Sequence, residues 1–355
     1  MRLGLTIRAW RNRLPTNMPA NPTLPSAPLT LRNTVFSPPL FSAPMAGITH
    51  SAFRRLLAAY GGYGALWTEM LSAKNILAEN VLASPWLKRS PQEGKVIYQL
   101  LVVDVDRLPE ILDRLAVLHP DGIDLNIACP APGIRRQRGG ADLFEDAVRL
   151  RDIVRVLRRN FAGPLLVKTR LGRQTPDWRE KLRDRLRLLE DEGVDALTLH
   201  PRYAEEKLKR SARHALYAEL AAETRLPIIA NGDIVSRDYA RSRAAQLAPA
   251  AGLMIGRMAA AQPWFFAKWH NPGLAVDYLA VWNRLCDYIA EDFPARQALG
   301  RIRIVTPYFA RNFLFGHTFF AKIQSAPDLA TARSRATEFL SQDPAPATHV
   351  TVNGI

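Results

Sequence analysis

The chain has 355 residues, of which 48% are hydrophobic, and it carries a formal net charge of +15. This length and apolar content exclude a mostly disordered protein and favour one large α/β domain, with or without a smaller module. Its two cysteines exclude a disulfide framework and a thiolate metal cage. The basic excess favours a polyanionic partner such as nucleic acid over mere solubilising charge. No apolar run reaches the ~18 residues of a membrane span, and two free cysteines fit a reducing cytoplasm. We expect a cytoplasmic protein, and we also expect it to be monomeric and to bind no metal.

Residues 1–36 begin with arginines around Trp10 and continue with many Pro, Ser and Asn residues but no hydrophobic period. This composition predicts a flexible leader. An organellar transit peptide is also rich in arginine and poor in acidic residues, although the density of prolines argues against its amphipathic helix. Both interpretations of the leader stay open.

From Phe41 onward a short apolar run, a polar or glycine-rich end and a helical segment follow one another repeatedly. The predicted strands begin near Phe41, Gly64, Lys95, Gly122, Pro164, Ala196, Pro227 and Gly252. The predicted helices include residues 51–60, 105–118, 143–160, 178–192, 213–223 and 236–247. Eight β/α units in about 230 residues predict an α/β fold, a (β/α)₈ TIM barrel over residues 37–272. A Rossmann sheet is the alternative.

After Trp269 the strand pattern stops, and helices are predicted over residues 276–290, 295–311 and 328–340. We therefore expect a small all-helical domain over residues 273–342 and a disordered tail over residues 343–355. Residues 295–320 interleave arginines with Tyr and Phe, a pattern that can bind phosphates and stacked bases. An amphipathic helix with its aromatic residues in the core explains the pattern equally well.

Polar side chains stand at or just beyond the end of nearly every predicted strand. They are Gln99, Asn126, Cys129, Lys168, His200, Asn231, Asp233 and Arg257. The carboxyl ends of barrel strands face one mouth, where barrel enzymes carry their active sites. The sequence therefore predicts a functional site at this mouth.

Cys129 is either a small packing residue or a reactive thiol. Most single cysteines are buried hydrophobes. Its position, at a strand end followed by Pro130 and a loop rich in Arg and Gly, is more open and more electropositive than a core site. Such surroundings favour thiol reactivity.

Two neighbouring strand ends carry phosphate-binding chemistry. Gly256 and Arg257 follow one apolar strand, where backbone amides and a guanidinium can approach an anion, and residues 231–233 (Asn-Gly-Asp) follow the preceding strand. Loops after strands seven and eight often form a phosphate site in barrels. A phosphorylated ligand is therefore expected.

Lys168 has two functional interpretations besides that of a surface lysine. A desolvated lysine can form a Schiff base with a carbonyl substrate. It can also stabilise negative charge on a reduced heterocycle such as a flavin. His200 can donate a hydrogen bond to the same ring or be a satisfied polar group, and the residues alone leave these alternatives open.

Nine motifs, in order, resemble those of the tRNA-dihydrouridine synthases. They are SAPMAGITHSAFR (42–54), WTEM (67–70), IYQL (97–100), DLNIACP (124–130), GGADLF (139–144), VKTRLG (167–172), LTLHPR (197–202), ANGDI (230–234) and MIGR (254–257). The resemblance extends from about residue 36 to residue 342. No single motif is decisive, but nine in register with the barrel spacing make it specific.

The resemblance implies a flavoprotein that holds FMN in a barrel, clasps tRNA with its helical domain and uses NADPH or NADH as reductant. Pro44, Met45 and Ala46 would contact the isoalloxazine. Gln99, Lys168 and His200 would bond its ring edges. Asn231, Gly232, Asp233, Gly256 and Arg257 would line the ribityl and phosphate end. Reduced flavin would pass a hydride to carbon 6 of a flipped-out uracil, and Cys129 would give the proton to carbon 5.

The chain departs from the family pattern mainly in loops expected to face RNA. Ala128 and Arg138 occupy positions where glycine is usual, and His50 replaces a usual Asp. Pro132 and Gly133 fall where a lysine normally follows the Cys-Pro pair, and residues 203–216 keep little of the family's sequence. The alternatives are therefore a tRNA-binding barrel with lost or altered activity, or a flavin ene-reductase for a small substrate.

Overall fold

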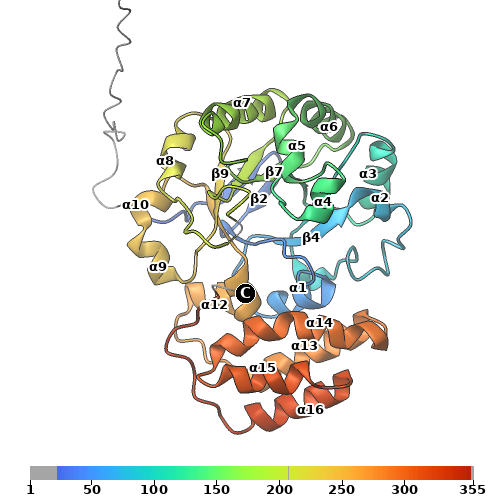
Figure 1. The fold of residues 1–355 in the computed structure, drawn as a ribbon, viewed down its shortest axis with the longest axis vertical. Helices are drawn as coiled ribbons and strands as arrows, with labels where there is room; N and C mark the ends of the chain where they lie inside the picture. Colours follow the sequence, from blue (N-terminus) through green and yellow to red (C-terminus); the bar gives the residue numbers. More distant parts are fainter. Residues whose placement is uncertain (1–21, 207, 353–355) are drawn as a thin grey trace, which may run out of the picture.

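The computed structural model describes residues 22–206 and 208–352. Its centre is an eight-stranded parallel sheet in the order β3-β10-β9-β8-β7-β6-β5-β4. The strands are β3 (Leu40–Ser42), β4 (Leu66–Ser72), β5 (Val96–Leu101), β6 (Gly122–Asn126), β7 (Leu165–Thr169), β8 (Ala196–Leu199), β9 (Ile228–Asn231) and β10 (Gly252–Ile255). A parallel bridge between Phe41 and Ala65 brings β3 against the start of β4. The predicted (β/α)₈ barrel is confirmed, and all eight predicted strands are present (Figure 1).

Helices cover the outside of this barrel (Figure 1). They are α1 (Ser51–Ala58), α2 (Ala73–Ile76), η1 (Pro91–Glu93), α3 (Leu108–Ala116), α4 (Pro132–Arg136), α5 (Ala141–Glu145), α6 (Ala147–Asn160), α7 (Trp178–Asp191), α8 (Leu216–Ala221), α9 (Arg237–Ser242), α10 (Ala244–Leu247), α11 (Arg257–Ala261) and α12 (Phe265–His270). The helix expected over residues 143–160 divides at Asp146, whose carboxylate accepts a hydrogen bond from the Arg149 amide at 3.2 Å and begins α6.

A short hairpin closes the amino end of the barrel. Its strands β1 (Leu29–Leu31) and β2 (Thr34–Phe36) are antiparallel. Leu29, Leu31 and Phe36 are buried against the first residues of the barrel strands. The expected flexible leader is therefore wrong for residues 29–36, because three inward apolar side chains offset the cost of ordering them. Residues 1–21 of that leader lie outside the described residues.

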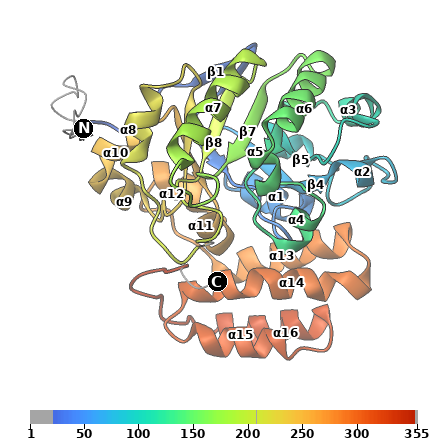
Figure 2. The ribbon, with the colours of Figure 1, turned by 45° about the horizontal axis from the view of Figure 1, so that its top comes forward.

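Four further α-helices form a layer below the barrel in Figures 1 and 2. They are α13 (Tyr278–Asp292), α14 (Ala295–Phe309), α15 (Gly316–Gln324) and α16 (Leu329–Leu340), with η2 (Ala310–Asn312) after α14. Helix α13 packs on α1, and α14 packs on α11. Helix α15 lies outside the predicted helices, which covered residues 276–290, 295–311 and 328–340. Phe309, Phe313 and Phe319 are buried, so the core explanation of the aromatic pattern holds for them.

The tail after α16 returns to the barrel instead of leaving the molecule. The Leu314 amide donates to the Ala345 carbonyl at 2.9 Å, and the Ala347 amide donates to the Asn312 carbonyl at 2.8 Å. Val352 is buried, and its carbonyl accepts a hydrogen bond from Arg257 at 3.1 Å. The expected disordered tail is therefore wrong for residues 343–352.

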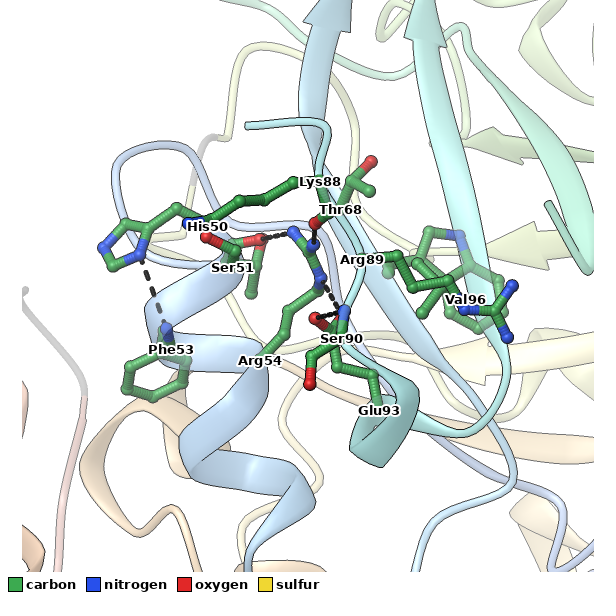
Figure 3. Close-up of polar contacts among 12 residues, drawn as sticks. His50, Ser51, Phe53, Arg54, Thr68, Lys88, Arg89, Ser90, Glu93 and Val96 are labelled. Atoms are coloured by element: carbon green, nitrogen blue, oxygen red, sulfur yellow. Dashed lines mark hydrogen bonds and ion pairs between the residues drawn. The ribbon is translucent and has the colours of Figure 1, made fainter. Parts of the chain in front are cut away.

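Ionic contacts join α1 to η1 and the loop before η1 to α13; Figure 3 shows the first of these, between Arg54 and Glu93. Arg54 and Glu93 form a fully buried pair at 2.7 Å, and the same guanidinium donates to the Thr49 and Lys88 carbonyls. The Lys88 ammonium lies 2.6 Å from the carboxylate of Asp292 on α13. Buried charges of this kind are tolerated only when they are paired and hydrogen-bonded. The contacts fix the helical layer against the barrel.

None of the helices within the described ranges is both long and apolar enough to cross a membrane.

His50 caps α1 at the same seam. Its Nδ1 accepts a hydrogen bond from the Phe53 amide at 3.4 Å (Figure 3). Its Nε2 is buried with no hydrogen-bond partner among the described residues. Its ring packs edge-on against Phe293, with ring centroids 4.8 Å apart. Burial, followed by the charges of Arg301 and Arg54, lowers the pKa of His50 well below its usual value.

This environment predicts an acid-sensitive fold. Below pH ~6.5 the unfolded chain binds a proton at His50 that the folded chain does not, so the free energy of unfolding falls as pH falls through this value. A plot of the free energy of unfolding against pH should therefore slope between pH 5 and 6.5. We expect His50→Asn, which keeps a capping oxygen, to reduce this slope by up to about 1.4 kcal/mol per pH unit. Denaturant unfolding at several pH values measures this. The same replacement at the exposed His119 is the control, and an unchanged slope in His50→Asn contradicts the prediction.

Candidate functional site

A pocket opens at the carboxyl ends of β7 to β10, beside the loop after β3. Its lining includes Pro44, Met45, Lys168, Arg170, His200, Asn231, Gly232, Asp233, Gly256, Arg257 and Val352. The predicted residues of these strand ends therefore come together in one place. Ala46 is exposed next to the pocket without lining it, and Gln99 is buried below the mouth.

Two glycines leave backbone open at one end of this pocket. Gly232 has φ +110°, and a Cβ there would lie 2.7 Å from Cδ2 and 2.8 Å from Nε2 of the His200 ring. A Cβ on Gly256 would lie 3.4 Å from the Met45 sulfur. Backbone that no side chain covers, next to a guanidinium, is the usual construction of a phosphate site. The residues at this end therefore fit a phosphorylated ligand.

Asp233 lines the pocket, and its carboxylate is held there by hydrogen bonds. Its carboxylate accepts hydrogen bonds from Arg202 at 2.6 and 2.8 Å, from Arg257 at 3.1 Å and from the Ala212 amide at 2.8 Å. Burial opposes its ionisation, but these hydrogen bonds outweigh that effect and lower the pKa of Asp233. A carboxylate held in this way repels an anion, so Asp233 orients two arginines instead of binding a phosphate itself.

The geometry around His200 fixes its tautomer. Its Nε2 lies 2.7 Å from the Arg202 guanidinium, which can only donate a hydrogen bond. Nε2 is therefore the acceptor, and the ring proton is on Nδ1. Burial, followed by the charges of Arg170, Lys168 and Arg202, lowers the pKa of His200 well below its usual value, so the ring is neutral.

Lys168 lies on β7, and Arg170 follows directly after the end of this strand; both line the pocket. Burial, followed by the charge of Arg170, lowers the pKa of Lys168 to about 8, and the charges of Asp124 and Cys129 oppose this decrease. Burial also lowers the pKa of Arg170 to about 10, and Cys129 is again among the opposing charges. The thiol thus lies within the electrostatic reach of both cations and is only partly buried.

Gln99 and Asn126 are joined below the mouth. The Asn126 side-chain amide donates to Gln99 Oε1 at 2.9 Å, and Gln99 Nε2 donates to Asp124 at 2.7 Å. The Ala128 and Cys129 backbone amides both donate to Asn126 Oδ1 at 3.0 Å. One hydrogen of the Gln99 amide remains for a ligand at a ring edge.

Arg170 and Arg202 stand in two of the nine motifs, but no role was predicted for either. Each lies just beyond the end of a strand and two residues after a predicted site residue, Lys168 or His200, and this proximity could have identified both. Val352 had no such signal.

Arg138, at a usual glycine position, has φ +60°, a conformation that favours glycine. Within the described residues, no group of three or more His, Cys, Asp or Glu side chains could hold a metal ion.

Comparison with known proteins agrees with this architecture. The family model described as dihydrouridine synthase (Dus) matches residues 41–290. A probable tRNA-dihydrouridine synthase of Helicobacter pylori (strain J99) is 30% identical over 316 residues, which cover 86% of this chain and 92% of that protein. A probable tRNA-dihydrouridine synthase 1 of Synechocystis is 30% identical over 220 residues, 62% of this chain and 61% of that protein.

Solved structures with a similar fold include two old yellow enzymes. The Zymomonas mobilis homologue has a TM-score of 0.51 at 13% identity and covers 73% of this chain and 96% of its own. The Trypanosoma cruzi enzyme has a TM-score of 0.50 at 8% identity and covers 71% and 93%. At these identities the likeness concerns the fold alone.

The fold and the family match together define an oxidoreductase built on a (β/α)₈ barrel. The chain belongs to the dihydrouridine synthase family.

Proposed function

We propose that this protein reduces specific uridines in tRNA to 5,6-dihydrouridine, with bound FMN, with NADPH or NADH as reductant and with Cys129 as proton donor. One observation carries the proposal: a partly buried thiol stands at the barrel mouth within the electrostatic reach of two cations, the buried Lys168 and the partly buried Arg170, that line a phosphate-type pocket. The names of the relatives support the choice of substrate.

The pocket suits FMN in both shape and charge. Gly232, Gly256 and Arg257 would hold the phosphate, with Asp233 orienting the guanidinium. Asn231 would line the ribityl chain, and its Nδ2 is already fixed by the Met254 carbonyl at 3.0 Å. The ring system would meet Pro44, Met45 and Ala46 on one side. Lys168, the Nδ1–H of His200 and the remaining Gln99 hydrogen would bond its edges.

Bound and reduced FMN would supply a hydride to carbon 6 of the uracil. The protein residues then have one proton to deliver. The S–H bond of Cys129 breaks as a C–H bond forms at carbon 5, leaving a thiolate near Lys168 and Arg170. Because a positive charge stabilises a thiolate, these two cations favour this proton transfer. Asn126 holds the Cys129 backbone amide in place during the transfer.

A uracil inside folded tRNA is stacked, so it must be extruded to reach the barrel mouth. We assign tRNA binding to the helical layer α13–α16, which packs beside the mouth through α14 and α11. The formal charge of +15 favours this polyanion.

The barrel over residues 37–272 would be the cofactor-binding domain. We place the protein in the cytoplasm as a monomer.

The test is direct. We expect the purified protein to be yellow, to lose its flavin absorbance when NADPH is added in the absence of oxygen, and to recover it only when unmodified tRNA follows. Mass spectrometry of the tRNA must then show a gain of two hydrogens at specific uridines. Binding of tRNA without this gain would favour a barrel that has lost its activity, as the altered loop at residues 132–138 suggests. Reoxidation by small enones but not by tRNA would favour an ene-reductase.

A further inference from the structure

Asp124 on β6 is a fully buried acid to which the proposed mechanism gives no task. It lies one layer below Asn126 on the same strand, since residues two apart point to the same side of a sheet. Its Oδ2 accepts hydrogen bonds from Gln99 Nε2 at 2.7 Å and from Trp67 Nε1 at 2.9 Å. Its Oδ1 has no hydrogen-bond partner among the described residues. A buried carboxylate that serves only the core is expensive.

A directed chain of hydrogen bonds runs from this carboxylate to the proposed proton donor. An ionised carboxylate only accepts, so Gln99 must turn its NH₂ group toward Asp124 and its oxygen toward Asn126. Asn126 must then turn its NH₂ group toward Gln99 and its oxygen toward the Ala128 and Cys129 amides. Backbone amides only donate, so the Ala128 and Cys129 amides also require the oxygen of Asn126 to face them. The carboxylate at one end of the chain and the amides at the other therefore impose the same direction.

We propose that Asp124 is a positioning residue: it fixes the direction of the Gln99 and Asn126 amides and, through them, the backbone that presents Cys129 at the mouth. The part concerning proton delivery rests on the proposed function. Asp124 itself is fully buried and does not line the pocket. Without its carboxylate, the two amides could reverse, and Asn126 would then face the Cys129 amide with a donor.

The charge of Asp124 has a second effect at the same mouth. Burial raises the pKa of Asp124 to about 6, against hydrogen bonds from Gln99 and Trp67 and the charge of Lys168. Asp124 in turn opposes the decrease in the pKa of Lys168. Removing this negative charge must lower the pKa of Lys168 further, so the lysine loses its proton at a lower pH. The two effects can be separated, because asparagine keeps an acceptor oxygen without the charge.

Hydrogen exchange of the full-length protein as purified tests the positioning role. We expect Asp124→Ala to speed exchange of the Ala128 and Cys129 amides at least ~10-fold, since their acceptor is no longer held in direction. Asp124→Asn should keep most of their protection. Asp121→Asn is the matched control. Its carboxylate also accepts from a strand, through the Val96 amide at 2.9 Å, but it has no contact with Gln99, and we expect no change at residues 128–129.

The charge effect gives a second readout. FMN affinity should fall at high pH, where Lys168 loses its proton. In Asp124→Asn the midpoint of this fall should lie at a lower pH than in the unchanged protein. KM for tRNA should stay the same, and kcat should fall. Unchanged exchange at Ala128 and Cys129 in a folded Asp124→Ala protein overturns the proposal. If that variant does not fold, Gln99→Met breaks the same chain of hydrogen bonds one residue further on, and unchanged exchange at Ala128 and Cys129 in that variant overturns the proposal. The exchange measurement needs no tRNA and no turnover, so it decides even if uridine reduction is disproved.

Discussion

Replacement of Cys129 by alanine should lower the rate of dihydrouridine formation by ~10²- to 10⁴-fold, the range typical of losing a positioned acid. The flavin should remain bound, because Cys129 does not line the pocket of Lys168, His200 and Arg257. Reduction of the flavin by NADPH should also keep its rate, since that step needs no proton from the thiol. Single-turnover mixing of reduced enzyme with unmodified tRNA isolates the affected step.

The second cysteine provides the matched control for this prediction. Cys286 is buried inside the helical layer, and burial raises the pKa of its thiol to about 12. Cys286→Ala should therefore leave the single-turnover rate unchanged, apart from some loss of stability. If Cys129→Ala reduces uridine as fast as the unchanged protein, another group delivers the proton and Cys129 leaves the mechanism.

Replacement of Gly232 by alanine should weaken FMN binding by ~10²-fold or more. At φ +110° an L-residue is strained by about 1–3 kcal/mol, and each 1.4 kcal/mol is tenfold in affinity. The new Cβ would also lie 2.7–2.8 Å from the His200 ring, which Arg202 holds in place. The ring or the backbone must move, and both belong to the pocket. Fluorescence of released FMN during titration measures the change.

Gly300 on α14 is the control for that substitution. A Cβ there meets nothing within 4 Å, and alanine in a helix is favoured over glycine by roughly 0.5–1 kcal/mol, so Gly300→Ala should bind FMN normally. Circular dichroism of Gly232→Ala separates lost binding from lost folding. A folded Gly232→Ala protein with unchanged FMN affinity would place the phosphate elsewhere.

The barrel was predictable because each strand is a buried apolar run that ends in a polar residue. Lys168, His200, Asn231 and Arg257 follow this rule, and the structure brings them to one pocket. The same rule could not separate residues that contact a ligand from residues that hold others in place. Asp233 lines the pocket with them, and the structure alone shows that its carboxylate is held by Arg202 and Arg257.

The segments whose structure could not be predicted are those ordered by contacts distant in the sequence. The hairpin at residues 29–36 has strands of three residues, too short for a period, and it is held by barrel residues such as Phe41 and Trp67. The tail at residues 343–352 is polar and rich in proline, yet backbone hydrogen bonds to Asn312 and Leu314 order it. Neither partner is identifiable from local composition.

The positions of these two segments have a practical consequence for measuring RNA binding. The hairpin covers the amino ends of the strands, whereas Val352 lies in the pocket at their carboxyl ends, with its carbonyl on Arg257. A fluorophore attached at Val352 would thus sit beside the opening that a nucleotide must enter. Attachment at Val35, which is exposed on the hairpin, leaves that entrance facing the solution.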